Sequence, residues 1–411
     1  GDVPEGAEVV EAGDLFVLPG LVDTHVHVNE PGRTEWEGFA TATAAAAAGG
    51  VTTIVDMPLN SIPPTVDVQA LNVKRASAAP QAIVDVGFWG GAIPSSLGSL
   101  RRLWDEGVFG FKCFLAPSGV DEFPHLDAAQ LERALQEVAS FGGLLLVHAE
   151  DPAVLERSAN DGGVSYPRFV QSRPPEAELD AIGRVIDGVR RTGARAHILH
   201  LSSAAALPML AAAKADGLPI TVETCPHYLV LDAEHIADGA TQFKCCPPIR
   251  DERNRDALWA GLVDGTIDLV VSDHSPATVE LKLGADGDFG RAWGGIAGLQ
   301  VGLQTVWTEA ARRGIGLESV VEWMSAGPAR FAGLESKGGI RSGADADLVV
   351  FSPDVVSTID AQGLRHKNPV SAYDGREVRG AVRGTLLAGR PVVESDPPRG
   401  RMLARVGAAR Q

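Results

Sequence analysis

The sequence predicts an α/β protein whose main body is a (β/α)8 TIM barrel, with a small composite β domain built from both termini. Eight short apolar runs, rich in residues that favour strands, predict the barrel. Segments with apolar residues at helical spacing separate these runs. Eight β/α repeats over roughly 250 residues are typical of such a barrel. A later change to short strands punctuated by glycine predicts the second domain.

In chain order, the barrel strands are predicted at residues 21–25, 52–57, 82–87, 108–114, 144–148, 196–200, 219–224 and 268–273. Thr34 and Glu37 have the spacing of a capping box, which predicts the start of a helix that Gly49 can close. Residues 126–141 and 176–192 show apolar residues at helical spacing between polar ones and predict further helices.

After a helical segment at 317–334, short strands are predicted at residues 343–351, 378–382 and 385–393. Residues 1 to 18 are expected to complete this sheet, so the predicted domains are 1–18 with 335–411 and 19–334. The chain starts at Gly1 without Met, and the N-terminal part of the small domain is expected to be truncated. The tail from Asp396 is rich in Pro, Gly and Arg, which predicts poor order.

Charge and cysteine content exclude several classes of partner. The chain has 411 residues with 36 basic and 53 acidic side chains, a formal net charge of −17. This balance argues against a nucleic-acid or anionic-membrane partner, because both reward clustered Lys and Arg. The 4 cysteines form no C-x-x-C pair, which predicts a reducing, cytoplasmic location without a disulfide framework. No signal peptide or membrane span is predicted.

A His-X-His pair at the end of the first barrel strand is the first candidate metal site. Side chains of an extended strand alternate with period two, so His25 and His27 project to the same side, close enough to share one metal. Two solvent-facing histidines on an exposed strand would give the same pattern. The pair alone therefore leaves the question of a metal open.

Three later strands end in further potential ligands, namely His148, His200 and Asp273. Catalytic groups of a (β/α)8 barrel lie at the carboxyl ends of its strands, so these side chains are predicted to meet. Each histidine alone could be a hydrogen-bonded core residue, and Asp273 could cap the segment after it. Their joint occurrence in strands five, six and eight favours a shared metal site.

Lys112 is a charged residue inside an apolar strand. It lies in Phe109-Gly110-Phe111-Lys112-Cys113-Phe114-Leu115, where an unpaired ammonium carries a large desolvation cost. Burial lowers the pKa of a lysine, and a neutral amine can add carbon dioxide to become a carbamate that bridges two metals. A lysine that reaches solvent or pairs with a carboxylate is the alternative. The surrounding candidate ligands favour the carbamate.

These features resemble the cyclic amidohydrolases of the amidohydrolase superfamily, and among them most closely the allantoinase group. The resemblance runs through the whole barrel and is carried by residues 19–38, 56–61, 111–115, 223–228, 244–250, 272–276 and 292–296. Characteristic stretches are Glu223-Thr224-Cys225-Pro226-His227-Tyr228 and Ala292-Trp293-Gly294-Gly295-Ile296.

The resemblance implies a binuclear centre of two divalent ions, zinc first, with manganese, cobalt or iron as alternatives. The implied ligands are His25 and His27 for one ion, His148 and His200 for the other, N6-carboxylated Lys112 as the bridge, and Asp273 in the first ion's shell. With Asp273 as the catalytic base, such a centre is expected to open the hydantoin ring of allantoin to allantoate, a step of purine catabolism. A homo-oligomer, by analogy a tetramer, is also expected.

Six residues are expected at the substrate pocket, namely Asn60, Ser118, His227, Cys245, Ser275 and Trp293. Structural alternatives exist, because Asn60 could shape a turn, Cys245 could be a core residue and Trp293 could only pack a loop. His227 could contact the substrate or support a group that does. The histidines without such a pattern are predicted to be structural or exposed, namely His125, His197, His235 and His366.

Asn29 distinguishes the chain from dihydroorotases, which typically carry Arg two residues after the second His. That Arg pairs with the substrate carboxylate, and an uncharged Asn cannot make this contact. A neutral ring is therefore the expected substrate, and Arg33 is predicted to be a loop or surface residue. Hydantoinases and dihydropyrimidinases, which accept uncharged ureide rings, are the second expectation. A non-catalytic scaffold is disfavoured because all six implied ligands are present.

Overall fold

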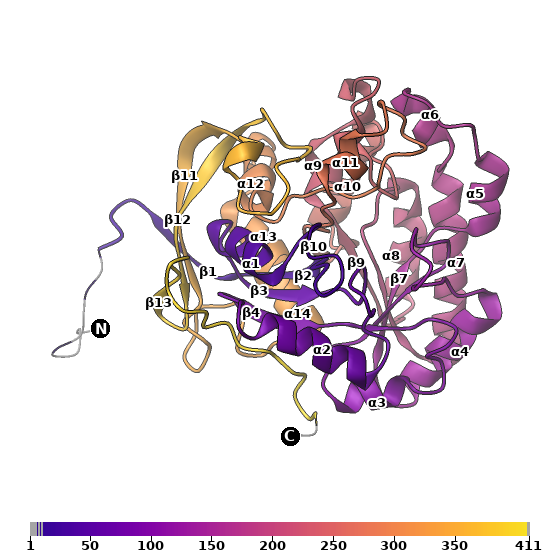
Figure 1. The fold of residues 1–411 in the computed structure, drawn as a ribbon, viewed down its shortest axis with the longest axis horizontal. Coiled ribbons are helices and arrows are strands. Elements are labelled where there is room, and N and C mark those ends of the chain that lie inside the picture. Colours follow the sequence, from indigo (N-terminus) through magenta and orange to yellow (C-terminus); the bar gives the residue numbers. More distant parts are fainter. Residues whose placement is uncertain (1–5, 7–8, 10, 409–411) are drawn as a thin grey trace.

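The computed structural model describes residues 6, 9 and 11–408, and its main body is a parallel barrel (Figure 1). Two parallel sheets form the barrel, with strand orders β2-β3-β4 and β5-β6-β7-β8-β9-β10. A parallel bridge between Val26 and His274 joins the last strand to the first, and β4 and β5 are two parts of the third barrel strand. The strands are β2 (Leu21–Val26), β3 (Val51–Asp56), β4 (Asp85–Phe88), β5 (Gly90–Gly91), β6 (Phe111–Phe114), β7 (Leu144–His148), β8 (Arg195–Ile198), β9 (Ile220–Thr224) and β10 (Leu269–Val270). The predicted (β/α)8 barrel is confirmed.

Helices follow the barrel strands and cover most of the barrel's outer surface (Figure 1). They are α1 (Phe39–Ala48), α2 (Val68–Ala78), α3 (Leu100–Asp105), α4 (Ala128–Ala139), α5 (Pro152–Ser158), α6 (Tyr166–Gln171), α7 (Pro175–Thr192), α8 (Leu207–Ala215), α9 (Pro226–Val230), α10 (Glu252–Val263), α11 (Val279–Leu283) and α12 (Gly302–Arg312). The segment predicted to be helical at 317–334 contains α13 (Leu317–Val321), a π-helical turn (Glu322–Ala326) and α14 (Gly327–Ala332). No helix among the described residues has the length and apolar character needed to cross a membrane.

The predicted capping box at Thr34 and Glu37 is wrong. Helix α1 begins at Phe39, after Gly38, and Thr34 lies in a turn before it. Glu37 is buried, and one of its carboxylate oxygens lies 3.2 Å from Nε2 of His274. This contact with a distant barrel residue holds Glu37 outside the helix, a tertiary effect that local spacing does not reveal. The predicted end of the helix at Gly49 is confirmed.

Alternation along the strands decides which side chains point into the barrel. In β7, Leu145 and Val147 belong to the large core between strands and helices, whereas Leu144 and Leu146 belong to a second apolar cluster. That cluster also collects residues from β3, β6 and β10, which places it in the barrel interior. His148 continues the inward series of β7. In β6, Lys112 shares the inward face of Phe114.

A small antiparallel sheet lies beside the barrel, next to α1 and α12 (Figure 1). Its strand order is β1-β11-β12-β13, with bounds β1 (Phe16–Pro19), β11 (Leu348–Thr358), β12 (Glu377–Leu387) and β13 (Arg390–Pro391). β1 and the C-terminal strands therefore form one composite sheet, as predicted. Residues 1–5, 7, 8, 10 and 409–411 of the predicted small domain lie outside the described residues, and the domain boundaries stay a prediction.

The single strand predicted at 385–393 is wrong. β12 runs to Leu387, and the chain then turns at Ala388 and Gly389, whose φ values of 50° and 76° are incompatible with a strand. The short β13 begins only after this turn. Residues 378–382 and the first part of 385–393 thus lie in one long strand, β12, and a tight turn connects this strand to β13 in a hairpin.

The C-terminal tail is ordered against the barrel as far as residue 408, so the prediction of poor order is wrong for this part. Main-chain N–H groups of Gly400 and Leu403 donate to carbonyls of Ala82 and Val86 at 2.9 and 2.8 Å. Arg401 pairs at 2.6 Å with the buried carboxylate of Asp85 in β4. The basic residues that suggested disorder therefore include one that anchors the tail.

Candidate metal centre and substrate pocket

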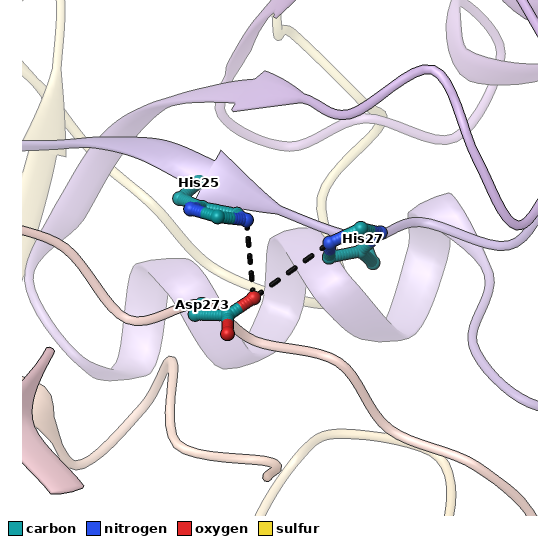
Figure 2. Close-up of side chains that lie close together, drawn as sticks. All are labelled: His25, His27 and Asp273. Carbon is teal, nitrogen blue, oxygen red and sulfur yellow. Dashed lines mark ion pairs between the residues drawn. The ribbon is translucent and has the colours of Figure 1, made fainter. Parts of the chain in front are cut away.

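His25, His27 and Asp273 meet at the carboxyl end of the barrel (Figure 2). Asp273 Oδ1 lies 3.1 Å from Nε2 of His25 and 3.7 Å from Nε2 of His27. All three residues are buried, and their ligand atoms lie within 4.8 Å of one another. Nitrogen and oxygen atoms that converge in this way can hold a divalent ion.

Buried acceptors orient both imidazoles of this group. His25 Nδ1 donates to Glu223 Oε1, and His27 Nδ1 lies 2.8 Å from the carbonyl oxygen of Leu59. With the proton on Nδ1, each ring presents the lone pair of Nε2 toward Asp273. Metal-binding histidines usually have such a second partner, because it fixes both the tautomer and the direction of the ring.

His148 and His200 form a second pair. His148 Nδ1 lies 2.9 Å from His200 Nε2, and His148 Nε2 lies 2.7 Å from Glu150 Oε2. The ring of Phe114 stacks on His148 with 4.6 Å between centroids. His200 Nδ1 is buried and has no hydrogen-bond partner among the described residues. A buried ring nitrogen without a protein partner fits a site where a bound ligand supplies that partner.

Unusual backbone conformations bring two of these residues into the site. His200 and Asp273 have φ values of 35° and 44° and are two of the four non-glycine residues with positive φ in the described chain. β8 ends at Ile198, which packs in the outer core, and regular alternation would direct residue 200 outward as well. The left-handed conformation breaks this alternation. Strain of this kind is typical of functional sites.

Lys112 adjoins the first pair of histidines. Its Nζ lies 3.3 Å from His25 Nε2 and 3.5 Å from His27 Nε2, and the residue is 1% exposed. Burial lowers the pKa of Lys112 to about 8, although the carboxylates of Asp273 and Glu223 act to raise it. The amine is therefore more easily deprotonated than that of an exposed lysine, which is the condition for carbamate formation.

Burial also keeps the site histidines neutral. It lowers the pKa of all four rings, and the positive charge of Lys112 lowers the pKa of His25 and His27 further. Neutral imidazole is the form that binds metal. Burial raises the pKa of Asp273 to about 7, against the effect of the nearby Lys112. Neutral nitrogen donors, one carboxylate and a deprotonatable lysine fit a pair of divalent ions.

A cavity of about 350 Å³ opens over these residues. This volume is within the range of small-molecule sites. Five of the six predicted pocket residues line it, namely Asn60, Ser118, Cys245, Ser275 and Trp293. The same cavity exposes His27, Lys112, His148, His200 and Asp273. Sequence segments that lie far apart in the chain thus share one cavity with the candidate ligands.

His227 is the predicted pocket residue that does not line this cavity. It is 1% exposed, and both ring nitrogens lack hydrogen-bond partners among the described residues. A ligand atom of His227 lies within 4.8 Å of one from Cys225 and one from Asp273, so the ring stands behind Asp273. In this structure His227 is therefore not placed to contact a molecule in the cavity directly.

Asn29 and Arg33 also lie outside the cavity wall. Asn29 is buried, and its amide lies 3.4 Å from the carbonyl of Pro276. Arg33 contacts the carbonyl of Asn60 at 2.6 Å and the carboxylate of Glu122 at 2.5 Å. Arg33 is thus a loop residue, as predicted, and it supports the backbone of a pocket residue.

Among the histidines predicted to be structural or exposed, two are buried and one is exposed, namely His197, His366 and His235. His197 is buried, with Nε2 at 2.9 Å from Glu223 and Nδ1 at 2.7 Å from Thr221. The side chain of His235 is 81% exposed. His366 is buried, with its ring centroid 5.8 Å from that of His274.

Sequence reasoning missed the acids behind the ligands. Glu223 holds His25, and Glu150 holds His148 and is itself held by Arg173 at 2.5 and 3.0 Å. Burial acts to raise the pKa of Glu150, but the charges of Arg173 and His148 lower it to about 2. The position of Glu223, an acidic residue within an apolar strand, could have indicated its role. Arg173 also lines the cavity, but it lies in a loop, where no sequence pattern indicates its role.

The profile of the amidohydrolase family matches residues 16–392. The chain belongs to the amidohydrolase family. The predicted resemblance is thereby confirmed, and the family implies a binuclear metal centre of the kind that the ligand geometry can hold.

Relatives within the amidohydrolase family cover nearly the whole chain. An allantoinase from Streptomyces avermitilis is 57% identical over 407 residues, which are 98% of this chain and 91% of the relative. An allantoinase from Saccharomyces cerevisiae is 46% identical, over 95% of this chain and 88% of the relative. Among solved structures, L-hydantoinase (dihydropyrimidinase) from Arthrobacter aurescens has a TM-score of 0.89 and 31% identity, over 98% of this chain and 90% of that chain.

Proposed function

We propose that this protein hydrolyses the hydantoin ring of allantoin to allantoate. The observation that carries the proposal is the extent of the likeness to allantoinases, which reaches 57% identity over 98% of the chain. The candidate ligands and predicted pocket residues that share one cavity support it. Ring opening would release a ureide acid, a step of purine catabolism.

The proposed ligands of the first ion are His25, His27 and Asp273, and those of the second are His148 and His200. Carboxylated Lys112 is the proposed bridge, supported by its burial beside His25 and His27. Zinc is the proposed metal, with manganese, cobalt and iron as alternatives, because histidine and carboxylate ligands suit all of them.

When bound, the two ions would supply Lewis acidity and lower the pKa of water from about 15.7 towards 7. Asp273 is the proposed catalytic base. It accepts a proton from the attacking water and delivers it to the ring nitrogen that leaves, which would otherwise depart as a poor amide anion. Its position at the cavity wall suits both halves of this transfer.

The substrate ring is proposed to lie between the loop that carries Asn60 and the segment that carries Trp293. Ser118 Oγ donates to the carbonyl of Phe123 at 2.6 Å, and Ser275 Oγ donates to the carbonyl of Asp273 at 2.8 Å. Both hydroxyls can therefore accept a hydrogen bond from a ring N–H while keeping their own donors engaged. Cys245 is proposed to pack against the ring, and His227 to act from behind Asp273.

Hydantoinase or dihydropyrimidinase activity is the second candidate. It is favoured by the likeness to solved structures of those enzymes, with 31% identity and TM-scores of 0.89 and 0.88. Dihydroorotase activity is a weaker alternative, because Asn29 cannot pair with a carboxylate as Arg would. A non-catalytic scaffold is the most remote candidate.

A homotetramer in the cytoplasm is the proposed assembly and location. The four free thiols, three of them buried, support a reducing compartment. Light scattering of the purified protein would test the tetramer directly.

The function is tested by NMR of products after racemic allantoin is added to metal-replete protein. Hydantoin, dihydrouracil and dihydroorotate are run in parallel at the same concentration. Allantoate from allantoin, at a rate far above that of the other rings, is the expected result. Preferential opening of dihydrouracil or hydantoin would replace the proposal with the second candidate.

A further inference from the structure

Lys282, in the short helix α11, is a buried lysine outside the candidate metal centre. The residue is 4% exposed. Its Nζ donates three hydrogen bonds, all to main-chain carbonyls, at 2.7 Å to Lys244, 3.1 Å to Trp293 and 2.5 Å to Gly295. An ammonium has three N–H donors, and all three are used here.

The three acceptors belong to two segments of the pocket wall. Lys244 precedes Cys245 and Cys246, and Trp293 and Gly295 lie in the irregular segment 290–295, all of which line the 350 Å³ cavity. The segments also contact each other directly, because Gly295 N–H donates to the Lys244 carbonyl at 2.9 Å and Lys244 Nζ donates to Ala292 at 2.5 Å. Lys282 therefore links two adjacent segments of the cavity wall.

Carbonyls of the irregular segment 290–295 that are turned away from solvent need donors, because the segment has no neighbouring strand or helical turn to supply them. Burial lowers the pKa of Lys282 to about 7, which reflects the free-energy cost of an ammonium at this position. Nearby Cys245 and Cys246 act to raise that pKa, and Lys244 acts to lower it. Three carbonyl acceptors gathered around one buried amino group indicate a specific role in fixing the segment.

The side chain of Trp293 connects this segment with other parts of the protein. Its ring meets Trp36 edge-on at 4.8 Å between centroids, and a Cβ added to Gly119 would lie 3.5 Å from it. Gly295 has φ of 131°, and a Cβ there would lie 2.3 Å from the carbonyl oxygen of Ser275. The segment thus packs against Trp36, lies close to the cavity residues Gly119 and Ser275, and has little room to shift.

We propose that Lys282 is a positioning residue for substrate binding: its ammonium fixes the segment 290–295 against residues 244–246, and so sets the shape of the pocket that receives a cyclic ureide. This inference rests on the proposed function for the identity of the ring. Lys282 does not line the cavity and acts through Trp293 and Gly295.

The test replaces Lys282 with Met, which keeps an unbranched side chain one atom shorter and removes the donors, and with Gln, which retains two N–H donors. Glu280→Gln, an exposed change in the same helix, is the matched control. KM for allantoin is expected to rise about tenfold or more in Lys282→Met, with kcat within about twofold of wild type, because substrate positioning and not the chemical step is lost. Lys282→Gln should show a smaller rise in KM.

Metal content and thermal unfolding are measured on every variant. Unchanged metal content with the raised KM supports the proposal. It is overturned if KM stays within about twofold while kcat falls, if metal is lost in step with activity, or if neither variant folds, since each result assigns Lys282 a purely structural role. Wild-type protein that opens another ring instead of allantoin would overturn only the substrate assignment, and the same KM comparison is then made with that ring.

Discussion

His25 donates from Nδ1 to the buried carboxylate of Glu223, so its other nitrogen faces Asp273 at 3.1 Å. The second oxygen of Glu223 lies 2.9 Å from His197 Nε2. Glu223 thus holds a candidate metal ligand on one side and a structural histidine on the other. Supporting contacts of this kind tune a metal site as strongly as some ligands do.

Glu223→Gln is expected to lower the affinity for one ion by about 10- to 100-fold, because an amide no longer favours the Nδ1–H tautomer of His25. Titration of apoprotein with zinc under competition from a chelator would measure it. Glu176→Gln, the same chemical change at the exposed start of α7, should leave both affinities unaltered. Equal affinities in Glu223→Gln and wild type would remove Glu223 from this role.

Asp273→Asn is expected to keep most of the bound metal and to lose turnover by about 100- to 10,000-fold, because the amide cannot accept the proton of the attacking water. Metal analysis and initial rates on the same sample separate the two effects. Asp264→Asn, at an exposed position after α10, is the control. A metal-loaded variant with wild-type rates would exclude Asp273 as the base.

Lys112→Ala is expected to lose both metal and activity, since a bridge between the ions would be missing. Short carboxylic acids, added during reconstitution, should restore part of the activity by taking the place of the carbamate. Lys214→Ala, which removes a lysine of α8 that pairs with Asp268, should show neither effect. Full metal content and full activity in Lys112→Ala would contradict the carbamate.

Reconstitution of apoprotein should be faster at alkaline pH. Carbamate forms from the neutral amine, and burial places the pKa of Lys112 at about 8. The neutral fraction therefore grows as pH rises through that value, by about 25-fold between about pH 6.5 and about 8.5. The recovery of activity, followed at constant carbon dioxide pressure, should show this trend. A rate that is flat or falls over this range would argue against a lysine that reacts as the free amine.

The barrel and the convergence of the candidate ligands could be predicted from the sequence because both depend on local pattern. Strand period two orients His25 and His27, and strand ends place His148 and Asp273 at one end of the barrel. His200 reaches the site through a left-handed backbone that no local pattern reveals. Its location after an apolar run was nevertheless sufficient to propose it.

Residues that act through long-range contacts were not predictable in the same way. Partners from distant segments bind the side chains of Glu223, Arg173 and Lys282. The residues next to each of them in the sequence do not indicate those partners. The same cause explains two errors. Glu37 matched a helix-capping pattern but contacts His274, and the Arg-rich tail suggested disorder although Arg401 pairs with Asp85.

The binuclear centre is tested by the rate of allantoate formation as zinc is added stepwise to apoprotein in the presence of bicarbonate. We expect no turnover in the apoprotein and a rate that rises until two equivalents per chain are bound and then stays constant. Turnover that is independent of added metal, or a plateau at one equivalent, would contradict a binuclear hydrolytic centre.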